Sequence, residues 1–179
     1  MEELGQHPHK KKQQHEWHDA LMDTYGLEMT KLAYTYVKNW STAQDVVQDV
    51  FVKAYHQYDQ REKLHSVKGW LIRLTINQAK DYLKSTWFRR VIGHGAQQPS
   101  PTTPTHEKSS FPSELSDAVM KLTQEYREVI FLFYYEDLTV REISEVLKVK
   151  EATLHTRLRR AKMLLLTELK GVDEVWRTN

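Results

Sequence analysis

A proline-rich segment divides this chain in two and limits what each part can fold into. Between Gly93 and Pro112 the sequence contains four prolines, interspersed with Gly, Ser, Thr and Gln. A segment of that composition cannot bury enough apolar surface to offset the entropy lost on ordering, so we expect a flexible linker. Its roughly 20 residues could extend to about 60 Å, which would let two domains bind distant sites on one partner.

Apolar residues recur at helical spacing on both sides of this segment, and no part of the chain shows sustained period-two alternation. The clearest stripes are Val46, Val47, Val50, Phe51, Ala54, Tyr55 and Tyr58 in the first half, and Leu154, Leu158, Ala161 and Leu165 in the second. The sequence therefore predicts an all-α fold of two small helical domains. We expect them at 16–92 and 113–170, with a disordered His- and Lys-rich tail at 1–15, the linker at 93–112 and a short tail at 171–179.

Local signals predict where the helices begin and stop. Three polar patterns match N-terminal helix caps: Ser41 with Gln44, Ser66 alone, and Thr139 with Glu142. Gly26 is expected to interrupt the first helical run, and the polar stretch 59–65 is expected to form a loop.

Charge is distributed unevenly, although the formal net charge is only +2. Residues 16–62 hold eight acidic and four basic residues, whereas residues 66–92 hold one acidic and six basic residues. The second half repeats this order, with eight acidic and three basic residues in 114–147, then two and seven in 148–170. Two basic segments favour two separate contacts with a polyanion such as nucleic acid, although two solvated helix faces would give the same pattern.

The basic segment of the second half has the form of a helix-turn-helix. A short capped helix with Ile143 and Leu147 inward is followed by a three-residue turn, 148–150, and a longer helix. The outer face of the longer helix could enter a major groove. The residues expected to contact bases or phosphates are Lys150, Thr153, His155, Thr156, Arg157, Arg159, Arg160 and Lys162. An ordinary antiparallel helix pair with a solvated basic face is the alternative.

Four segments, in order along the chain, resemble parts of the extracytoplasmic-function sigma factors, a group within the sigma-70 family. AQDVVQDVFVKAYHQYD (43–59) resembles their core-binding helix, and GWLIRLTINQAKDYL (69–83) resembles their promoter-melting helix. LTQEYREVIFLFYYEDL (122–138) and LTVREISEVLKVKEATLHTRLRRAKMLL (138–165) resemble the domain that reads the promoter −35 element. The resemblance implies a sigma domain 2 helical bundle, a sigma domain 4 helix-turn-helix and a role in directing RNA polymerase to promoters.

The resemblance also implies roles for particular residues. The face that would bind the clamp coiled coil of the polymerase largest subunit consists of Asp45, Gln48, Asp49, Val52 and Lys53. The residues that would contact the −10 element are Arg61, Lys68, Arg73, Asn77, Lys80 and Lys84. Asn77 would lie near a base flipped from the duplex, although it could instead be a buried polar residue bonded to a helix end. The implied partners are core polymerase (clamp and flap), double- and single-stranded promoter DNA, and an anti-sigma factor.

Several positions depart from the family pattern, among them Ser144 and Ala152, where another small residue is usual. Lys148 stands where such turns usually carry Gly, which predicts a strained backbone. His155 replaces a usual Lys or Arg, so the −35 preference is expected to differ and to depend weakly on pH. Arg61 replaces a frequent aromatic residue in a loop, which alters the expected shape of the −10 base pocket.

Catalytic and metal-binding functions find little support in the sequence. It contains no glycine-rich phosphate loop, nucleophile elbow or paired acid–base motif, so we expect no catalytic site, cofactor or small-molecule substrate. It has no cysteine, and the histidines at 7, 9, 15 and 18 lie in a stretch without a carboxylate cage, so no metal is expected. It shows no secretory signal or membrane-spanning run, which favours the cytoplasm, with the membrane reached only through an anti-sigma factor.

Two rival classes of function stay open at this point. A stand-alone helix-turn-helix regulator would dimerise and bind a palindrome without polymerase. A helical adaptor would bind proteins only, so Arg159 and His155 would form no cross-link to DNA. A sigma factor, by contrast, binds promoter DNA poorly alone and well with core polymerase.

Overall fold

The computed structural model describes residues 6–92 and 113–169, and within these ranges it contains helices and no strand. The chain separates into two compact units, the first ending at Ser100 and the second beginning at Pro101. The all-α fold with two helical units is thereby confirmed. The expected linker at 93–112 and the expected tail at 171–179 lie outside the residues described.

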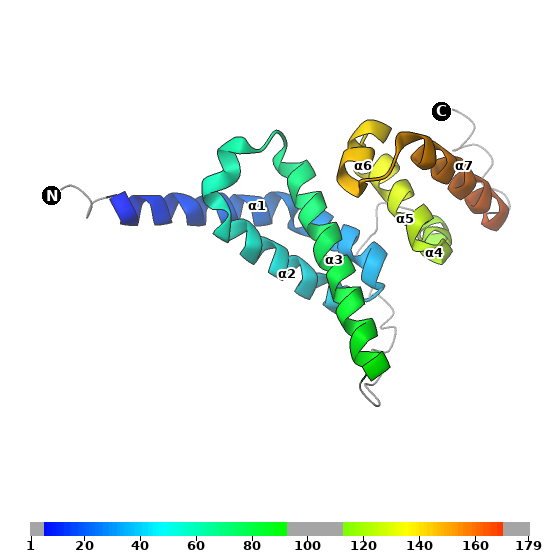
Figure 1. Ribbon diagram of the computed structural model, residues 1–179, viewed down its shortest axis with the longest axis horizontal. Helices are drawn as coiled ribbons and strands as arrows, with labels where there is room; N and C mark the ends of the chain where they lie inside the picture. Colours follow the sequence, from blue (N-terminus) through cyan, green and yellow to red (C-terminus); the bar gives the residue numbers. More distant parts are fainter. Residues whose placement is uncertain (1–5, 93–112, 170–179) are drawn as a thin grey trace. The chain divides into compact units, whose positions relative to one another are not determined.

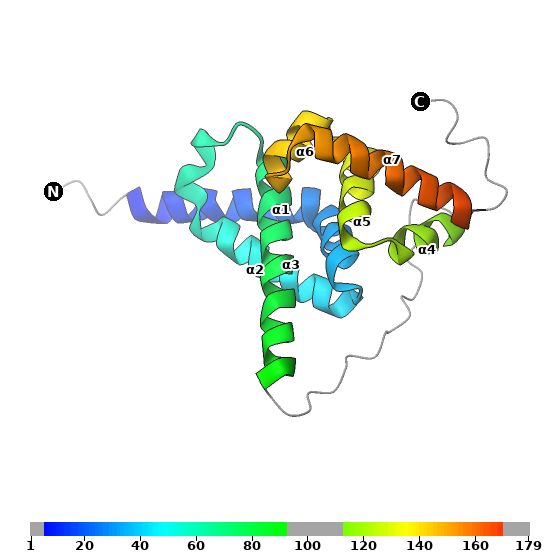
Figure 2. The same ribbon diagram turned by 45° about the vertical axis from the view of Figure 1, so that its right-hand side comes forward.

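The first unit is a bundle of α1 (Gln6–Val37), α2 (Trp40–His56) and α3 (Val67–Ile92), with the 3₁₀ helix η1 (Tyr58–Lys63) between α2 and α3. Each long helix packs against the other two, as Figures 1 and 2 show. The side chains that are fully buried between them include Met29, Leu32, Val46, Val50, Leu71 and Ile72. Burying each such side chain stabilises the fold by about 1.5–3 kcal/mol relative to leaving it exposed.

Helix α1 differs from the sequence-based expectation in two places. Residues 6–15 are helical, so the predicted disordered tail is wrong for this segment, because Lys10 and Gln14 contact η1 and the end of α2. Gly26 lies inside the helix and does not interrupt it. The buried side chains of Leu21 and Met29 lie on either side of Gly26, and their burial outweighs the 0.5–1 kcal/mol, roughly, that a mid-helix glycine costs.

The helix starts in this unit follow the predictions only in part. Asn39 caps α2, since its Oδ1 accepts a hydrogen bond from the Thr42 N–H at 2.9 Å, so the predicted cap two residues later is wrong. Asparagine is among the best N-cap residues, which explains the earlier start. Ser66 caps α3 as predicted, with its Oγ accepting a hydrogen bond from the Gly69 N–H at 3.0 Å. The predicted loop at 59–65 is largely the short 3₁₀ helix η1.

The second unit contains α4 (Ser113–Lys121), α5 (Gln124–Ile130), the π-helical turn η2 (Phe131–Tyr135), α6 (Val140–Leu147) and α7 (Glu151–Glu168). Helix α7 packs against α4, α5 and α6 (Figure 2). The predicted stripe of α7 is buried, and so are Val129, Leu132 and Ile143 on the other elements.

The turn between α6 and α7 has the local geometry that the sequence predicts. The Thr139 Oγ1 accepts a hydrogen bond from the Glu142 N–H, and the Glu142 carboxylate accepts one from the Thr139 N–H at 2.8 Å, which completes the capping box. Lys148 ends α6 in the left-handed conformation, with φ 58° and ψ 40°. Its N–H donates to the Ser144 carbonyl at 2.9 Å. These contacts set the direction in which α7 leaves the turn.

Candidate protein and nucleic-acid interfaces

One side of α2 is exposed over its whole length and carries all five side chains predicted to bind polymerase. Their spacing of three and four residues places them on one face, opposite the buried Val46, Val47 and Val50. Two of the five are acidic, one is basic, and Val52 is 50% exposed. A face of this composition suits a protein surface better than a polyanion.

A chain of polar contacts links this face of α2 to α3. The Gln78 Nε2 donates a hydrogen bond to the Asp49 Oδ2 at 3.0 Å, and the Lys53 Nζ donates one to the Gln78 Oε1. Gln78 directly follows Asn77, so the helix that carries the residue predicted to hold a base is bonded to the face of α2 predicted to bind polymerase. Nothing in the spacing of α3 shows which α2 residues Gln78 faces, so its role cannot be read from the sequence.

The outer face of α3 is cationic. Arg73, Asn77 and Lys84 are exposed and Lys80 is half-buried, and their spacing puts all four on one side of the helix. The exposure of Asn77 excludes the alternative that it is a buried polar residue. The Lys84 Nζ lies 3.9 Å from Asp81, an exposed pair that leaves its charge largely available. The Lys80 Nζ lies 5.7 Å from the centre of the Tyr36 ring.

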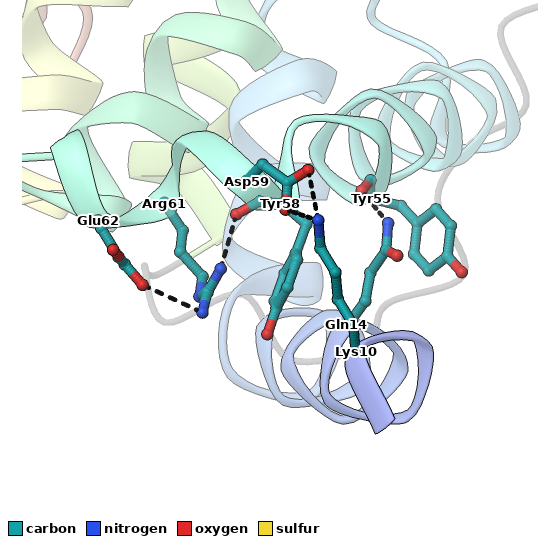
Figure 3. A network of polar contacts seen from close by, with 7 residues as sticks. All are labelled: Lys10, Gln14, Tyr55, Tyr58, Asp59, Arg61 and Glu62. Atoms are coloured by element: carbon teal, nitrogen blue, oxygen red, sulfur yellow. Dashed lines mark hydrogen bonds and ion pairs between the residues drawn. The ribbon is translucent and has the colours of Figure 1, made fainter. Parts of the chain in front are cut away.

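The two remaining residues of the predicted −10 set have partners within the protein. The Lys68 Nζ lies 2.6 Å from Glu28 Oε1, and each of the two side chains is about one-third exposed or less. The Arg61 guanidinium lies 3.8 Å above the Tyr58 ring, donates to the Tyr58 carbonyl at 3.2 Å and pairs with Glu62 at 3.3 Å (Figure 3). The orientation of Arg61 therefore depends on Tyr58, whereas Lys68 is held against α1.

The first half of α7 exposes most of the residues predicted to read duplex DNA. Those that are exposed are Lys150, Thr153, His155, Thr156, Arg159 and Arg160. The Thr156 hydroxyl donates to the Ala152 carbonyl at 3.0 Å, which leaves its lone pairs outward. A helix with a cationic, exposed face and an apolar, buried face meets the geometric need for insertion into a major groove.

Arg157 and Lys162 are placed differently from the other six. The Arg157 guanidinium pairs with Glu125 at 3.3 Å and with Glu128 at 3.5 Å, and its side chain is only 18% exposed. The Lys162 Nζ lies 5.2 Å from the centre of the Tyr134 ring. Both side chains therefore bind α7 to α5 and η2. The sequence offered one signal for this pairing, which was the acidic stretch that contains the two glutamates.

The second half of α7 exposes an apolar surface that the sequence analysis did not single out. Met163, Leu164 and Leu166 are 63%, 45% and 44% exposed. Neighbouring exposed apolar side chains are typical of a surface that meets another protein. The described residues hold no group of three or more His, Asp or Glu side chains placed to bind a metal, and none of their helices is long and apolar enough to cross a membrane.

Comparisons with known proteins agree with this arrangement. Residues 21–89 match the family described as Sigma-70 region 2, and residues 113–165 match the one described as Sigma-70, region 4. RNA polymerase sigma factor SigV of Bacillus subtilis (strain 168) is 30% identical over 144 residues, which cover 80% of this chain and 85% of SigV. ECF RNA polymerase sigma factor SigW of the same organism is 25% identical over 169 residues, 85% of this chain and 88% of SigW.

Two solved structures share the fold. The sigma factor RpoE, in complex with the anti-sigma factor NepR from Bartonella quintana, is 21% identical with a TM-score of 0.75, over 88% of this chain and 98% of that one. CnrH, in complex with the cytosolic domain of CnrY, is 23% identical with a TM-score of 0.59, over 86% of this chain and 87% of that one. The family matches, the relatives and the fold lead to one conclusion: this chain belongs to the extracytoplasmic-function sigma factors, the sigma-70-type RNA polymerase sigma factors that direct transcription initiation.

Proposed function

We propose that the first unit binds core RNA polymerase through α2 and the −10 element through α3, and that the second unit reads the −35 element through α7. The observation that carries this division is the placement of charge. The exposed face of α2 has more acidic than basic side chains, whereas the exposed faces of α3 and of the first half of α7 are cationic. The proposed domain bounds are those expected from the sequence, except that α1 begins at Gln6.

The α2 face supports a protein partner. Asp45 and Asp49 would repel nucleic acid, and the exposed Val52 between them and Lys53 would be buried against a protein. The partner in this proposal is the clamp coiled coil of the polymerase largest subunit.

The α3 face supports contact with an opened strand. The Asn77 amide offers both a donor and an acceptor to the edge of an unpaired base. Arg73 and Lys84, one turn before it and two turns after it, can neutralise the phosphates on either side of that base. Lys80 adds to this charge. Lys68, which pairs with Glu28 in the free protein, would contribute only after leaving that partner, whereas Arg61 would contribute from its position on the Tyr58 ring.

The α7 face supports reading of a closed duplex. Arg159 can bond guanine O6 and N7 together, and His155 can meet a base edge or a phosphate. Lys150 at the start of the helix, and Arg160, suit backbone phosphates. We leave Arg157 and Lys162 in supporting roles, because their side chains hold α7 against the rest of the unit.

The apolar part of α7 supports a second protein contact beside the DNA. We propose the polymerase flap as its partner during initiation, and an anti-sigma factor as a competitor for this surface and for α2. The RpoE and CnrH structures are both complexes, the first with an anti-sigma factor and the second with the cytosolic domain of CnrY. The proposed location is the cytoplasm, with any attachment to a membrane made through that partner. No catalytic step or cofactor enters this function.

Run-off transcription tests the proposal directly. Purified core polymerase is mixed with the protein and with a library of upstream regions, and the transcripts are sequenced. We expect transcripts that start downstream of a shared two-part motif, and none of them with core polymerase alone. A folded protein that yields no promoter-specific transcript would contradict the proposal. Tight binding to a palindrome without polymerase would instead favour a stand-alone regulator.

A further inference from the structure

The first three turns of α1 are helical although almost nothing in them is apolar. Residues 9–16 read HKKKQQHE, and the side chains of 9–13 are exposed. Apolar burial therefore does not explain why this segment lies against the first unit. Specific polar contacts must hold it, and they are few enough to name.

These contacts end on a single place, the junction between α2 and η1 (Figure 3). The Lys10 Nζ lies 2.8 Å from one carboxylate oxygen of Asp59 and 2.9 Å from the other. The Gln14 Nε2 donates to the carbonyl of Tyr55, in the last turn of α2, at 2.7 Å. The His15 Nε2 and the Tyr55 hydroxyl lie 3.2 Å apart.

The same junction positions Arg61. Tyr58 is 4% exposed, and its ring meets Trp17 of α1 edge-on, with 5.5 Å between ring centroids. Arg61 lies over the same ring and donates to the Tyr58 carbonyl. A short 3₁₀ helix has poorly aligned hydrogen bonds of its own, so its position depends on what it is docked against. In η1 that support includes Lys10 and Trp17 of α1, beside the contacts that η1 makes with α2.

We propose that residues 10–15 of α1 act as a clamp on η1, and that this clamp sets the orientation of Arg61 and thereby the base preference of the −10 pocket. The inference rests on the proposed function, since it assigns Arg61 to the −10 element. Lys10 and Gln14 are positioning residues here, because they reach DNA only through η1. The clamp would also explain how an arginine with several rotamers can select a base.

The chain offers a matched control for this clamp. Lys12 lies in the same helical turn and has the same charge, but its ion pair is with Glu16 of its own helix, at 3.8 Å, and it has no ion pair with η1 in the part of the chain that the structure describes. The test compares a double variant, which combines Lys10→Ala and Gln14→Ala, with the single control variant Lys12→Ala. Each is assayed with core polymerase on promoters randomised in the −10 element and, separately, in the −35 element.

We expect the double variant to lower the preference for the favoured −10 base by about threefold, the size typical of losing one exposed ion pair and one hydrogen bond. The double variant should keep its affinity for core polymerase and its −35 preference within about twofold of the wild type. The −10 preference of the Lys12→Ala variant should also stay within about twofold of the wild type. In an Arg61→Ala background the double substitution should change nothing further, because its effect passes through Arg61.

Three results would overturn the clamp. The first is an unchanged −10 profile in the folded double variant. The second is an equal loss at −10 and −35 elements, which would indicate general destabilisation. The third is a full effect of the double substitution in the Arg61→Ala background. A wild-type protein that gives no promoter-specific transcript would instead refute the proposed function, so the two failures are distinguishable.

Discussion

Replacing Lys148 by glycine is expected to stabilise the second unit. Lys148 occupies the left-handed region, with φ 58° and ψ 40°, at the turn between α6 and α7. A side chain with a Cβ atom costs about 1–2 kcal/mol in that conformation, because the Cβ approaches the following carbonyl oxygen. Glycine avoids this clash but loses about 0.5–1 kcal/mol more than alanine in backbone entropy on folding. The backbone effects alone therefore favour glycine by about 1 kcal/mol.

Charge must be separated from backbone strain in this experiment. A cation in the last turn of a helix contributes about 0.3–1 kcal/mol through the helix dipole, and Lys148→Gly removes it. The Lys148→Ala variant removes the same charge and keeps the Cβ atom, so it is the proper reference. We expect Lys148→Gly to be more stable than Lys148→Ala by about 1 kcal/mol, and Lys148→Ala to be slightly less stable than the wild type.

Hydrogen exchange of the buried amides of α7 is the suitable assay, because it reports on the second unit alone. A difference of 1 kcal/mol corresponds to exchange about five times slower in the glycine variant than in the alanine variant, when exchange is limited by the opening equilibrium. Equal or faster exchange in the glycine variant would refute the argument that the turn is strained. Promoter preference should be the same in both variants, because neither changes the exposed face of α7.

Three further predictions follow from other parts of the structure. Arg159→Ala should reduce discrimination between bases at the −35 element by about 1–3 kcal/mol and leave binding to core polymerase intact. Binding of the holoenzyme to promoters with altered −35 elements measures this discrimination. A loss of binding to core polymerase would show that the surfaces are wrongly assigned. Gly26→Ala should stabilise the first unit by about 0.5–1 kcal/mol in urea unfolding, because nothing lies within 4 Å of the added Cβ atom; a loss of stability would mean that the helix needs glycine there. Thr139→Ala should cost about 1 kcal/mol through the lost cap. It should also make the stability of the second unit depend less on pH, because hydrogen bonds from the Thr139 hydroxyl and N–H lower the pKa of Glu142. The stabilisation from these bonds is complete above the ordinary carboxyl pKa and is lost as the pH falls through the lowered pKa. Unfolding curves whose pH dependence is the same in the variant and the wild type would contradict this.

Most of the features that the sequence predicted correctly depend on interactions between near neighbours. The caps at Ser66 and Thr139 and the left-handed turn at Lys148 each involve residues within four positions of one another. The buried stripes of α2 and α7 follow from helical spacing alone. Even the incorrect cap of α2 was a choice between two local signals, in which Asn39 prevailed over the pair at Ser41 and Gln44.

The features that were missed depend on residues far apart in the sequence. The helical segment 6–15 was expected to be disordered because its composition is polar, and its contact with η1 joins Lys10 to a residue 49 positions away. Arg157 was assigned to DNA because it lies in a basic helix, but Glu128, 29 positions earlier, faces it in the fold. Gln78 escaped notice for the same reason, since its partners are on α2.

Read alone, the sequence predicts two all-helical units with acidic and basic faces, and its motifs, in a consistent order, identify the family. Helical periodicity and capping are local, so they can be read without knowing the fold. The packing of the helices settles which cations point to solvent, which are paired within the protein, and that residues 6–15 are helical. Those outcomes depend on electrostatic and hydrogen-bond contacts across the bundle, whose strength is set by distance in space and not along the chain.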